Sequence, residues 1–526
     1  MKKLYYGGPI LTMGTPASAE GVLTEDGKII KVGSLEEMKR QGADAVPVDL
    51  KGRTMLPGFV DAHGHFTQTA MGFLQVSLEG AESEEEIRRR IQDFIDRGKI
   101  RPGSWIQARD YDHNQLPGGR HLSREAIQGL APGYALAVHH KSGHSGLFNR
   151  MALEQAGIAP DTKEPAGGRI GRDENGLTGY LEENAYFMAA RQIPMPGSRE
   201  LLDAYQKAQG LYASFGVTTM QEGMLVKQML PLYRLLLDAD ILKLDLIAYP
   251  DLETLAEAER EIKGTGEKTP GHVRLGGIKI FLDGSPQGRT AWMTEPYEGE
   301  DAYRGYGTMK DEEVLEALAE AGRRKLQILA HCNGDAAAEQ FLDCLEKAER
   351  TDPELKRLRP VMIHSQFLRA DQMPRAKALG VIASFFTAHT WYWGDVHVKN
   401  LGIKRASQIS AASSALSCGL PFTLHQDSPV IQPDMLETVW CAVNRFTKNG
   451  RVLGPEQRIS VREALKAVTI NAAYQYFEEN EKGSIAPGKR ADFVILSDNP
   501  LCVPPDRLRD IWVEETLKDG QQIYRR

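Results

Sequence analysis

The sequence Met-Leu-Pro-Gly-Phe-Val-Asp-Ala-His-Gly-His-Phe at residues 55–66 decides the fold that we expect for this chain. The Pro-Gly pair at 57–58 is a turn signal, and the apolar Phe-Val pair at 59–60 is typical of a short buried strand. Polar residues of ligand type follow directly. A turn, a buried strand and then polar ligands is the order expected at a strand end that carries chemistry.

Two histidines in this segment, His63 and His65, lie two positions apart. On a strand that spacing points both rings to one face, about 7 Å apart along the chain, so they could share one cation. Gly64 leaves room for the metal, and Asp61 could orient one ring by a hydrogen bond. We interpret the segment as part of a metal site, with two hydrogen-bonded core histidines as the alternative.

Length and composition describe a large globular protein. The 526 residues suit a barrel of about 250 or more residues with additions. Hydrophobic residues make up 41% and charged residues 26%, and the net charge of −7 gives no reason to expect nucleic acid or an acidic membrane as partner. The five cysteines show no paired spacing, and no apolar run suits a signal peptide or a membrane span. We therefore expect a cytoplasmic protein.

Both ends of the chain read as short strands. Apolar runs at 22–24 and 29–32 flank Asp26-Gly27, a pair typical of a hairpin turn, and Asp519-Gly520 is flanked in the same way. Neither end has enough apolar surface to stand alone. We predict one composite β-domain from residues 1–56 and 483–526.

The region between the two ends alternates strand and helix patterns, which predicts an α/β fold. Counting the opening strand, eight strands in βα alternation indicate a (β/α)8 barrel over 57–482, with its active site at the carboxyl ends of the strands. Residues from about 80 to 200 do not fit this count and are expected to form an insertion. The further strands are predicted at 216–221, 244–249, 277–282, 327–331, 360–364, 381–386 and 421–427.

The predicted fold places several polar side chains at the ends of its strands. Barrel closure would bring strand eight beside strand one, so Asp427 would face the two histidines of the opening strand. A single residue of ligand type at a strand end can arise by chance, but a set of six would do so far less often. The set that predicts a metal-dependent site is His63, His65, Lys279, His331, His364 and Asp427.

This constellation resembles the amidohydrolase superfamily, and the chain is similar to its family 3, the YtcJ-like metal-dependent hydrolases. The resemblance implies a distorted barrel, the composite β-domain, and one or two divalent metals, usually Zn²⁺, held by the six residues above. It also implies that Lys279 bridges two metals as its carbamate. The motifs that carry it are 56–65, Gly143-His144 with Asn149, 165–181, Lys279 with 283–285, and 483–496.

The ligand set indicates hydrolysis by an activated water. Asp427 is the predicted proton shuttle, and His364 is either a ligand or an oxyanion stabiliser. Where the family commonly ends strand eight with Gly-Ser-Asp, this chain has His425-Gln426-Asp427, which we expect to alter the size of substrate accepted.

Further residues are weaker candidates for substrate contacts. Each has an ordinary alternative: a buried structural histidine, a solvated loop, or packing of a lid. Aromatic residues after strand seven favour an apolar or aromatic substrate group. The predicted substrate-binding residues are His144, Asp283, Arg289, His389 and Trp393, whereas His113, His121, His272 and His397 are expected at the surface.

Three function classes remain open. The first is hydrolysis of a small amide, such as an N-acyl, N-formyl or cyclic amide. The second is deamination of a heterocycle, but deaminases on this barrel typically carry Glu three residues after the strand-five histidine, where this chain has Gly334. The third is a binding protein without catalysis. Besides the small-molecule substrate, a homodimer is the one partner left open.

Overall fold

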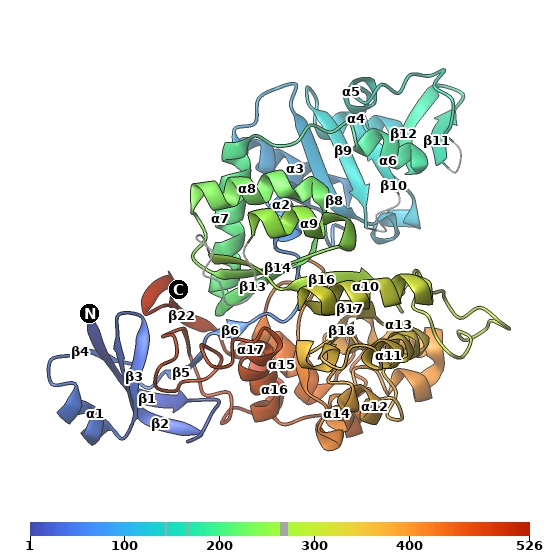
Figure 1. Cartoon of the computed structure of the whole chain (residues 1–526). Coiled ribbons are helices and arrows are strands. Elements are labelled where there is room, and N and C mark those ends of the chain that lie inside the picture. The colour runs from blue at the N-terminus through green and yellow to red at the C-terminus, as the bar shows by residue number, and fades with distance from the viewer. Residues whose placement is uncertain (142–144, 166–167, 263–271) are drawn as a thin grey trace. The chain divides into compact units, whose positions relative to one another are not determined.

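The computed structural model describes residues 1–141, 145–165, 168–262 and 272–526 (Figure 1). These residues form two compact units, of which the first comprises 1–67 and 208–526 and the second 68–207. The expected insertion at about 80–200 falls within the range of the second unit. The division of the first unit into a β-domain and a catalytic body stays a prediction.

An eight-stranded sheet of the first unit combines strands from both ends of the chain. Its order is β23-β22-β21-β5-β1-β2-β3, with β4 paired to β1. Both predicted hairpins are confirmed, because Glu25 pairs with Lys28 and Lys518 with Gln521 in antiparallel register. The strands are β1 (Lys2–Leu11), β2 (Ser18–Glu25), β3 (Lys28–Gly33), β4 (Val46–Asp49), β5 (Thr54–Pro57), β21 (Phe493–Leu496), β22 (Val513–Lys518) and β23 (Gln521–Arg525).

The catalytic body contains two parallel sheets, ordered β6-β13-β14-β15 and β16-β17-β18-β19-β20. Each strand predicted from the sequence is present. Their apolar side chains converge, because Val60, Ile247, Leu329, Ile363 and Ile382 from five different strands belong to one buried cluster. The strands are β6 (Phe59–Val60), β13 (Val217–Leu225), β14 (Asp245–Pro250), β15 (Val273–Leu275), β16 (Gly277–Phe281), β17 (Gln327–Cys332), β18 (Val361–His364), β19 (Ile382–Phe385) and β20 (Phe422–Leu424).

Backbone hydrogen bonds connect the outer strands of these two sheets. After β6 and β20, the N–H of His65 donates to the carbonyl of Ser428 at 2.6 Å, and the N–H of Asp427 donates to the carbonyl of His63 at 3.2 Å. On the other side, β15 of one sheet continues through Gly276 directly into β16 of the other. The segments that follow the first and last strands therefore lie side by side.

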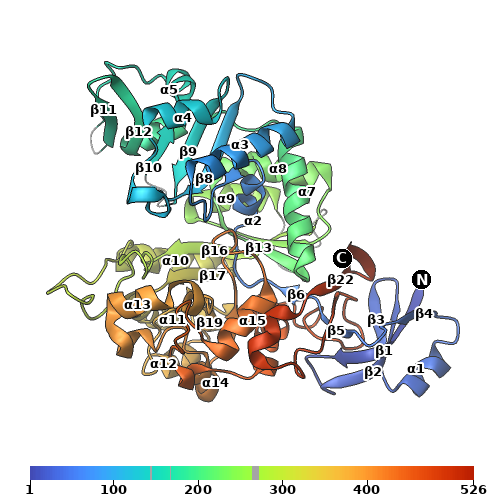
Figure 2. The same cartoon turned by 180° about the vertical axis from the view of Figure 1, so that it is seen from behind.

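Helices separate the strands of the catalytic body, as the alternating pattern predicts (Figures 1 and 2). The predicted helix before β13 is present as α7. Helix α1 (Leu35–Gln41) lies between β3 and β4 of the eight-stranded sheet, and the others are α2 (Phe66–Gly72), α7 (Ser198–Ser214), α8 (Leu230–Ala239), α9 (Leu252–Glu261), α10 (Asp311–Arg324), α11 (Asp335–Glu349), α12 (Met373–Ala378), α13 (His389–Ala406), α14 (Ala412–Cys418), α15 (Met435–Asn444), α16 (Val461–Ala467) and α17 (Ile470–Gln475).

A buried ion-pair network joins β14 to the C-terminal strands. Asp245, at the start of β14, contacts the ammonium groups of Lys482 and Lys518, the latter at 2.7 Å. Lys518 also lies 2.7 Å from Asp492, which precedes β21. Burial alone would raise the pKa of Asp245, but the two lysines outweigh it and hold this pKa well below its usual range.

The second unit is built on a six-stranded sheet, ordered β11-β12-β10-β9-β8-β7. Along β9 the residues alternate between two cores, with Leu136 and Val138 in one and Ala135 and Ala137 in the other, so the sheet is covered on both faces. The elements are β7 (Val76–Ser77), β8 (Trp105–Tyr111), β9 (Ala135–His140), β10 (Ser145–Phe148), β11 (Gly168–Asp173), β12 (Gly176–Glu183), α3 (Glu84–Gly98), α4 (Arg124–Leu130), α5 (Arg150–Gln155) and α6 (Asn184–Ala190).

Across the described ranges, none of the helices has both the length and the apolar character that crossing a membrane requires. All five cysteines lie in the described part of the chain and are free thiols.

Candidate metal centre

Three predicted ligands meet where the segments after β6 and β20 lie side by side. The Nε2 atoms of His63 and His65 each lie 3.4 Å from Oδ1 of Asp427. One ligand atom from each residue falls within 4.8 Å of the others. Asp427 has a backbone φ of 55°, in the left-handed region, and the turn there directs its carboxylate back to the histidines.

These separations fit a shared cation. Two donors held about 2.0–2.1 Å from a tetrahedral metal stand roughly 3.3 Å apart, which is close to both histidine–aspartate distances. Oδ1 of Asp427 is buried and accepts no hydrogen bond from the described residues. A carboxylate oxygen buried between two imidazole nitrogens is the arrangement that a divalent metal satisfies.

A hydrogen bond to Gln221 orients the ring of His63. Its Nδ1 lies 2.6 Å from Oε1 of Gln221 on β13, and Nε2 of Gln221 donates to the carbonyl of Ala62 at 2.9 Å. An amide oxygen as partner requires the proton on Nδ1, which leaves Nε2 with a lone pair toward Asp427. Burial, and after it the charge of Lys279, lowers the pKa of His63 well below its usual value. The imidazole is therefore in the neutral form that binds metals.

His65 is placed against an acidic neighbour. Its Nδ1 lies 3.8 Å from Oε1 of Glu222, whose other oxygen accepts hydrogen bonds from the Thr67 N–H at 2.8 Å and the Tyr233 hydroxyl at 3.0 Å. Burial raises the pKa of Glu222. Neither Gln221 nor Glu222 was expected from the sequence. The signal available was their position in the polar run that ends the predicted second strand.

His331 and His364 continue the group around the strand ends. Their ring centroids lie 4.7 Å apart, and those of His63 and His364 lie 5.4 Å apart. Nε2 of His364 is 3.9 Å from Oδ2 of Asp427. His331 turns Nδ1 to Asp283 at 3.2 Å, and its Nε2 is 3.3 Å from Nδ2 of Asn333. Both histidines therefore belong to the same cluster of rings, and their ligation of a metal stays a prediction.

Lys279 has an environment that suits a reactive amine. Its side chain on β16 is buried, and the described residues supply no hydrogen-bond partner to Nζ. Burial lowers its pKa to about 7, with partial opposition from Asp427 and Cys332. A neutral amine at physiological pH can take up carbon dioxide, whereas an ammonium cannot. Asp283 does not pair with this amine, because its oxygens accept backbone N–H groups instead.

Asp283 and Arg289 are engaged by the protein. Asp283 accepts from the backbone N–H groups of Trp292, Asn333 and Gly334 at 2.7–3.0 Å. The guanidinium of Arg289 donates through all three nitrogens, to the Asn400 side chain, to Glu300 and to the carbonyl of Glu298, each at 3.1 Å. These bonds favour a positioning role for both residues. Their predicted contact with substrate stays a prediction.

His425, expected from the sequence only to alter the size of substrate accepted, also belongs to this site. It is fully buried, and its Nε2 lies 3.1 Å from Nδ1 of His364 while Oγ of Ser384 lies 2.9 Å from its Nδ1. His425 precedes Asp427 by two positions, the same spacing that singled out His63 and His65. That spacing was the available signal, because alternate residues of a strand share a face.

Aromatic rings extend from His425 along α13. Phe386 lies 5.3 Å from His425 and 4.6 Å from His389, and His389 lies 4.5 Å from Trp393. Trp391 instead packs on Trp440 at 5.3 Å, on a different face of the helix. Of the aromatic run after strand seven, Trp393 is the member joined to this row.

The expectation that His397 lies at the surface is wrong. It is fully buried and stacks parallel to His389, with 3.1 Å between Nε2 of His397 and Nδ1 of His389. The error arose because a lone polar residue in a helix reads as exposed when its partner eight residues earlier is not considered. His144 lies outside the described residues.

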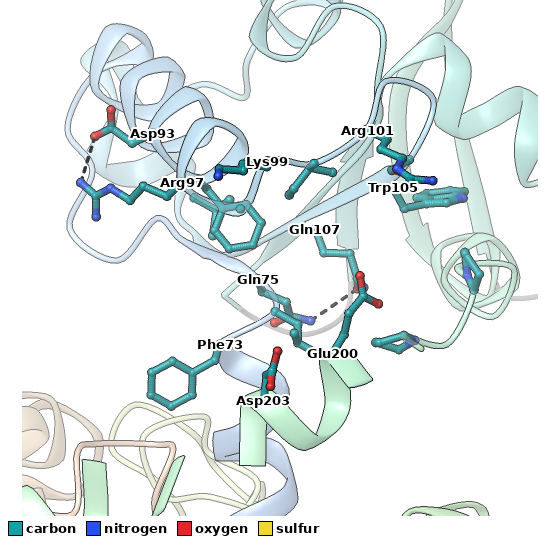
Figure 3. Close-up of a pocket in the computed structure, with 18 of the residues that line it drawn as sticks. Phe73, Gln75, Asp93, Arg97, Lys99, Arg101, Trp105, Gln107, Glu200 and Asp203 are labelled. Carbon is teal, nitrogen blue, oxygen red and sulfur yellow. Dashed lines mark hydrogen bonds and ion pairs between the residues drawn. The ribbon is translucent and has the colours of Figure 1, made fainter. Parts of the chain in front are cut away.

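The second unit contains a cavity of about 1240 Å³, lined by residues from α3, β8 and α7 (Figure 3). Its wall carries both signs of charge, including the ion pair of Arg97 and Asp93 at 3.8 Å, and a bond from Gln75 to Gln107 at 3.4 Å. None of the predicted ligands lines it. The cavity is therefore separate from the metal centre in the residues that form it.

Residues 47–524 match the model of the amidohydrolase family, and the chain belongs to that family. It is 27% identical over 543 residues to the YtcJ protein of Bacillus subtilis (strain 168), an alignment that covers 100% of this chain and 99% of that one. It is 26% identical to the N-substituted formamide deformylase of Arthrobacter pascens, over 97% of this chain and 95% of that one.

A solved structure gives the same assignment. The crystal structure of a metal-dependent hydrolase from Pyrococcus furiosus superposes with a TM-score of 0.78 at 25% identity, covering 95% of this chain and all of that one. The family and this neighbour make the chain a hydrolase of carbon–nitrogen bonds other than peptide bonds, with a TIM-barrel-like α/β fold. They also imply a divalent metal, which the donors of His63, His65 and Asp427 fit.

Proposed function

We propose that the protein hydrolyses a small amide, of the N-acyl or N-formyl type, with Zn²⁺ as the metal. The observation that carries this proposal is the placement of His63 and His65 at equal 3.4 Å distances from one oxygen of Asp427. Mixed imidazole and carboxylate donors suit zinc. The formamide deformylase relative supports the N-formyl class, at 26% identity.

We also propose that the eight strands close into a distorted (β/α)8 barrel. The hydrogen bonds between the segments after β6 and β20, and the continuity of β15 with β16 through Gly276, support closure on both sides. All the proposed ligands would then lie at the carboxyl ends of strands, where barrel enzymes carry their active sites.

Asp427 and His364 have separate roles in the proposed reaction. When bound, the metal supplies a nucleophilic water at neutral pH and polarises the substrate carbonyl. Asp427 takes the proton of the attacking water and returns it to the leaving nitrogen. It is assigned this role because its carboxylate lies between His63 and His65, the proposed metal ligands. His364, with Nε2 toward Oδ2 of Asp427 at 3.9 Å, is placed either to hold metal or to stabilise the developing oxyanion.

Lys279 is proposed to act as its carbamate. The buried, unpartnered Nζ and the pKa near 7 favour the neutral amine that this modification needs. The carbamate would provide two oxygens toward the side where His331 and His364 lie, and so complete a second metal position.

The aromatic row Phe386–His389–Trp393 supports an apolar group on the substrate. Aromatic walls favour apolar groups through the area they remove from water, at roughly 25 cal/mol per Å². His144, Asp283 and Arg289 are retained as proposed contacts or supports for the polar end of the substrate.

Deamination of a heterocycle is disfavoured by the backbone at Gly334. A Cβ at this position would lie 1.8 Å from the carbonyl oxygen of Trp292, so the Glu that such deaminases carry three residues after His331 has no room. Cyclic amide hydrolysis uses the same groups as the N-acyl reaction and remains the second candidate.

The test is a panel of matched amides assayed with purified protein. N-formyl, N-acetyl and cyclic amides with one common amine are compared by kcat/KM, beside an aminated heterocycle assayed for ammonia release. We expect amide turnover that disappears on chelation and returns with Zn²⁺. Turnover of the heterocycle alone, or equal amide turnover in protein shown to be metal-free, would refute the proposal.

A further inference from the structure

The second unit contains its own group of ligand-type side chains, formed by Asp112, His113 and His140. We propose that these three residues bind a divalent transition metal, at a site that shares no residue with the catalytic centre. The proposal is independent of the reaction assigned above.

The fold brings the three residues to one edge of the sheet. Asp112 directly follows β8, His113 begins the 3₁₀ turn His113–Gln115, and His140 is the last residue of β9. β8 and β9 are parallel neighbours, with Tyr111 in register with His140. The carboxyl ends of adjacent parallel strands meet at one edge, so a residue just past the end of β8 reaches the end of β9.

The distances fit a metal. One ligand atom from each residue lies within 4.8 Å of the other two. Nδ1 of His113 and Nε2 of His140 are 3.1 Å apart, close to the roughly 3.3 Å expected for two nitrogens on a tetrahedral zinc. Two imidazoles and a carboxylate are the donor set of three-residue zinc sites, which keep a further position for water.

The surroundings hold these rings in place. His121 stacks on His113 with 4.0 Å between centroids, and Tyr111 lies 6.0 Å from His140. All three proposed ligands are half-buried, so a hydrated ion can reach them. Burial and the neighbouring His113 lower the pKa of His140, and they lower that of His121 to about 4. Both shifts favour the neutral forms of the His140 and His121 rings.

The donors also indicate the class of ion and its effect. Imidazole with carboxylate suits Zn²⁺, Ni²⁺, Co²⁺ and Cu²⁺ rather than Mg²⁺ or Ca²⁺, which prefer oxygen. A bound ion would cross-link the turn after β8 to the end of β9. The second unit should therefore gain stability on binding, since an ion that binds only the folded form shifts the unfolding equilibrium.

The experiment uses full-length protein in which His63→Ala, His65→Ala, His331→Ala and His364→Ala remove ligands of both proposed catalytic metal positions. This variant is stripped of metal, titrated with Co²⁺ and Zn²⁺, and followed by visible absorption of Co²⁺, by bound metal per chain after desalting, and by thermal unfolding. We expect one equivalent to bind, to give the absorption of a nitrogen-ligated Co²⁺, and to raise Tm.

Adding His113→Gln and His140→Gln should abolish that equivalent and the Tm shift. Asp112→Asn, which keeps the shape of the side chain, should weaken binding at least about ten-fold. His272→Gln, a histidine outside both groups, is the control and should leave binding unchanged. The proposal is overturned if the parent variant binds no metal, or if its stoichiometry and Tm shift survive the paired His113 and His140 substitutions.

Discussion

Nδ1 of His364 and Nε2 of His425 lie 3.1 Å apart, and this contact fixes which nitrogen of His364 faces the catalytic centre. If Nε2 of His364 presents its lone pair toward Asp427, its Nδ1 carries the proton and donates to His425. His425 must then donate from its own Nδ1 to the Ser384 hydroxyl, 2.9 Å away. Burial lowers the pKa of His425 to about 3, so this chain of bonds is uncharged near neutrality.

Replacing His425 with Phe should lower metal affinity or kcat by about 10–100-fold. The ring volume is kept, but His364 loses the acceptor that orients it. Metal content by elemental analysis and kcat under saturating Zn²⁺ are the measurements. Ser384→Ala, one bond further away, is the matched control and should cost less. Wild-type affinity and turnover in His425→Phe would show that the contact is only packing.

Asp427→Asn should reduce turnover by about 100-fold or more, because the amide keeps the shape of the side chain but cannot take a proton. Steady-state kinetics are paired with metal analysis of the same samples. Loss of the metal along with turnover would make Asp427 mainly a ligand, whereas normal turnover would remove it from the mechanism.

Lys279→Met should lower the metal content from two equivalents per chain to one, because it removes the proposed bridging carbamate and keeps an apolar side chain of similar length. Protein equilibrated with ¹³C-bicarbonate should show a carbamate signal in wild type that is missing from the variant. A wild-type protein that holds one metal and shows no carbamate signal contradicts the bridge. Asn333→Ala, beside His331, serves as a control that leaves the amine in place.

Asp245→Asn should destabilise the protein by about 3–5 kcal/mol, because it leaves the buried ammonium groups of Lys482 and Lys518 without their shared carboxylate. The measurement is denaturant unfolding of metal-loaded protein. Asp251→Asn, at the N-cap of α9, is the matched control and should cost little, because Asn caps a helix about as well as Asp. Equal losses in the two variants would contradict a special role for the network.

The same network sets a pH dependence. The pKa of Asp245 in the folded protein lies well below its unfolded value, which is about 4. Its contribution is therefore fully present above pH 4 and is lost as the pH falls from there through the folded pKa. Unfolding free energies measured across this range should decline less steeply in Asp245→Asn than in wild type.

The strands and most proposed ligands could be predicted because both depend on local pattern. Apolar runs mark buried strands, and a polar residue at the end of such a run marks a strand end, which is the pattern that predicts His331 and His364. What a side chain contacts across the structure has no local signal. For Asp283, predicted as a substrate contact, nothing near it in the sequence shows that three backbone N–H groups converge on it.

Histidines illustrate the same limit in two ways. His397 was expected at the surface, but pairing with His389 allows it to be buried. The group at Asp112, His113 and His140 was not recognised because its members are 28 positions apart and meet only when β8 and β9 pair. His425 and Asp427 have the same two-residue spacing as His63 and His65. Here the local pattern was sufficient to indicate that His425 belongs to the site.

The sheet shared by the two chain ends has a consequence for synthesis on the ribosome. β5 leads within one residue into β6 and the histidines beyond it, yet its partner β21 begins at residue 493. The carbonyls of Asp61 and Ala62 are likewise held by Tyr476 and Gln475. The first proposed ligands to be translated therefore reach their final geometry only after the more than 400 residues up to β21 have also been made.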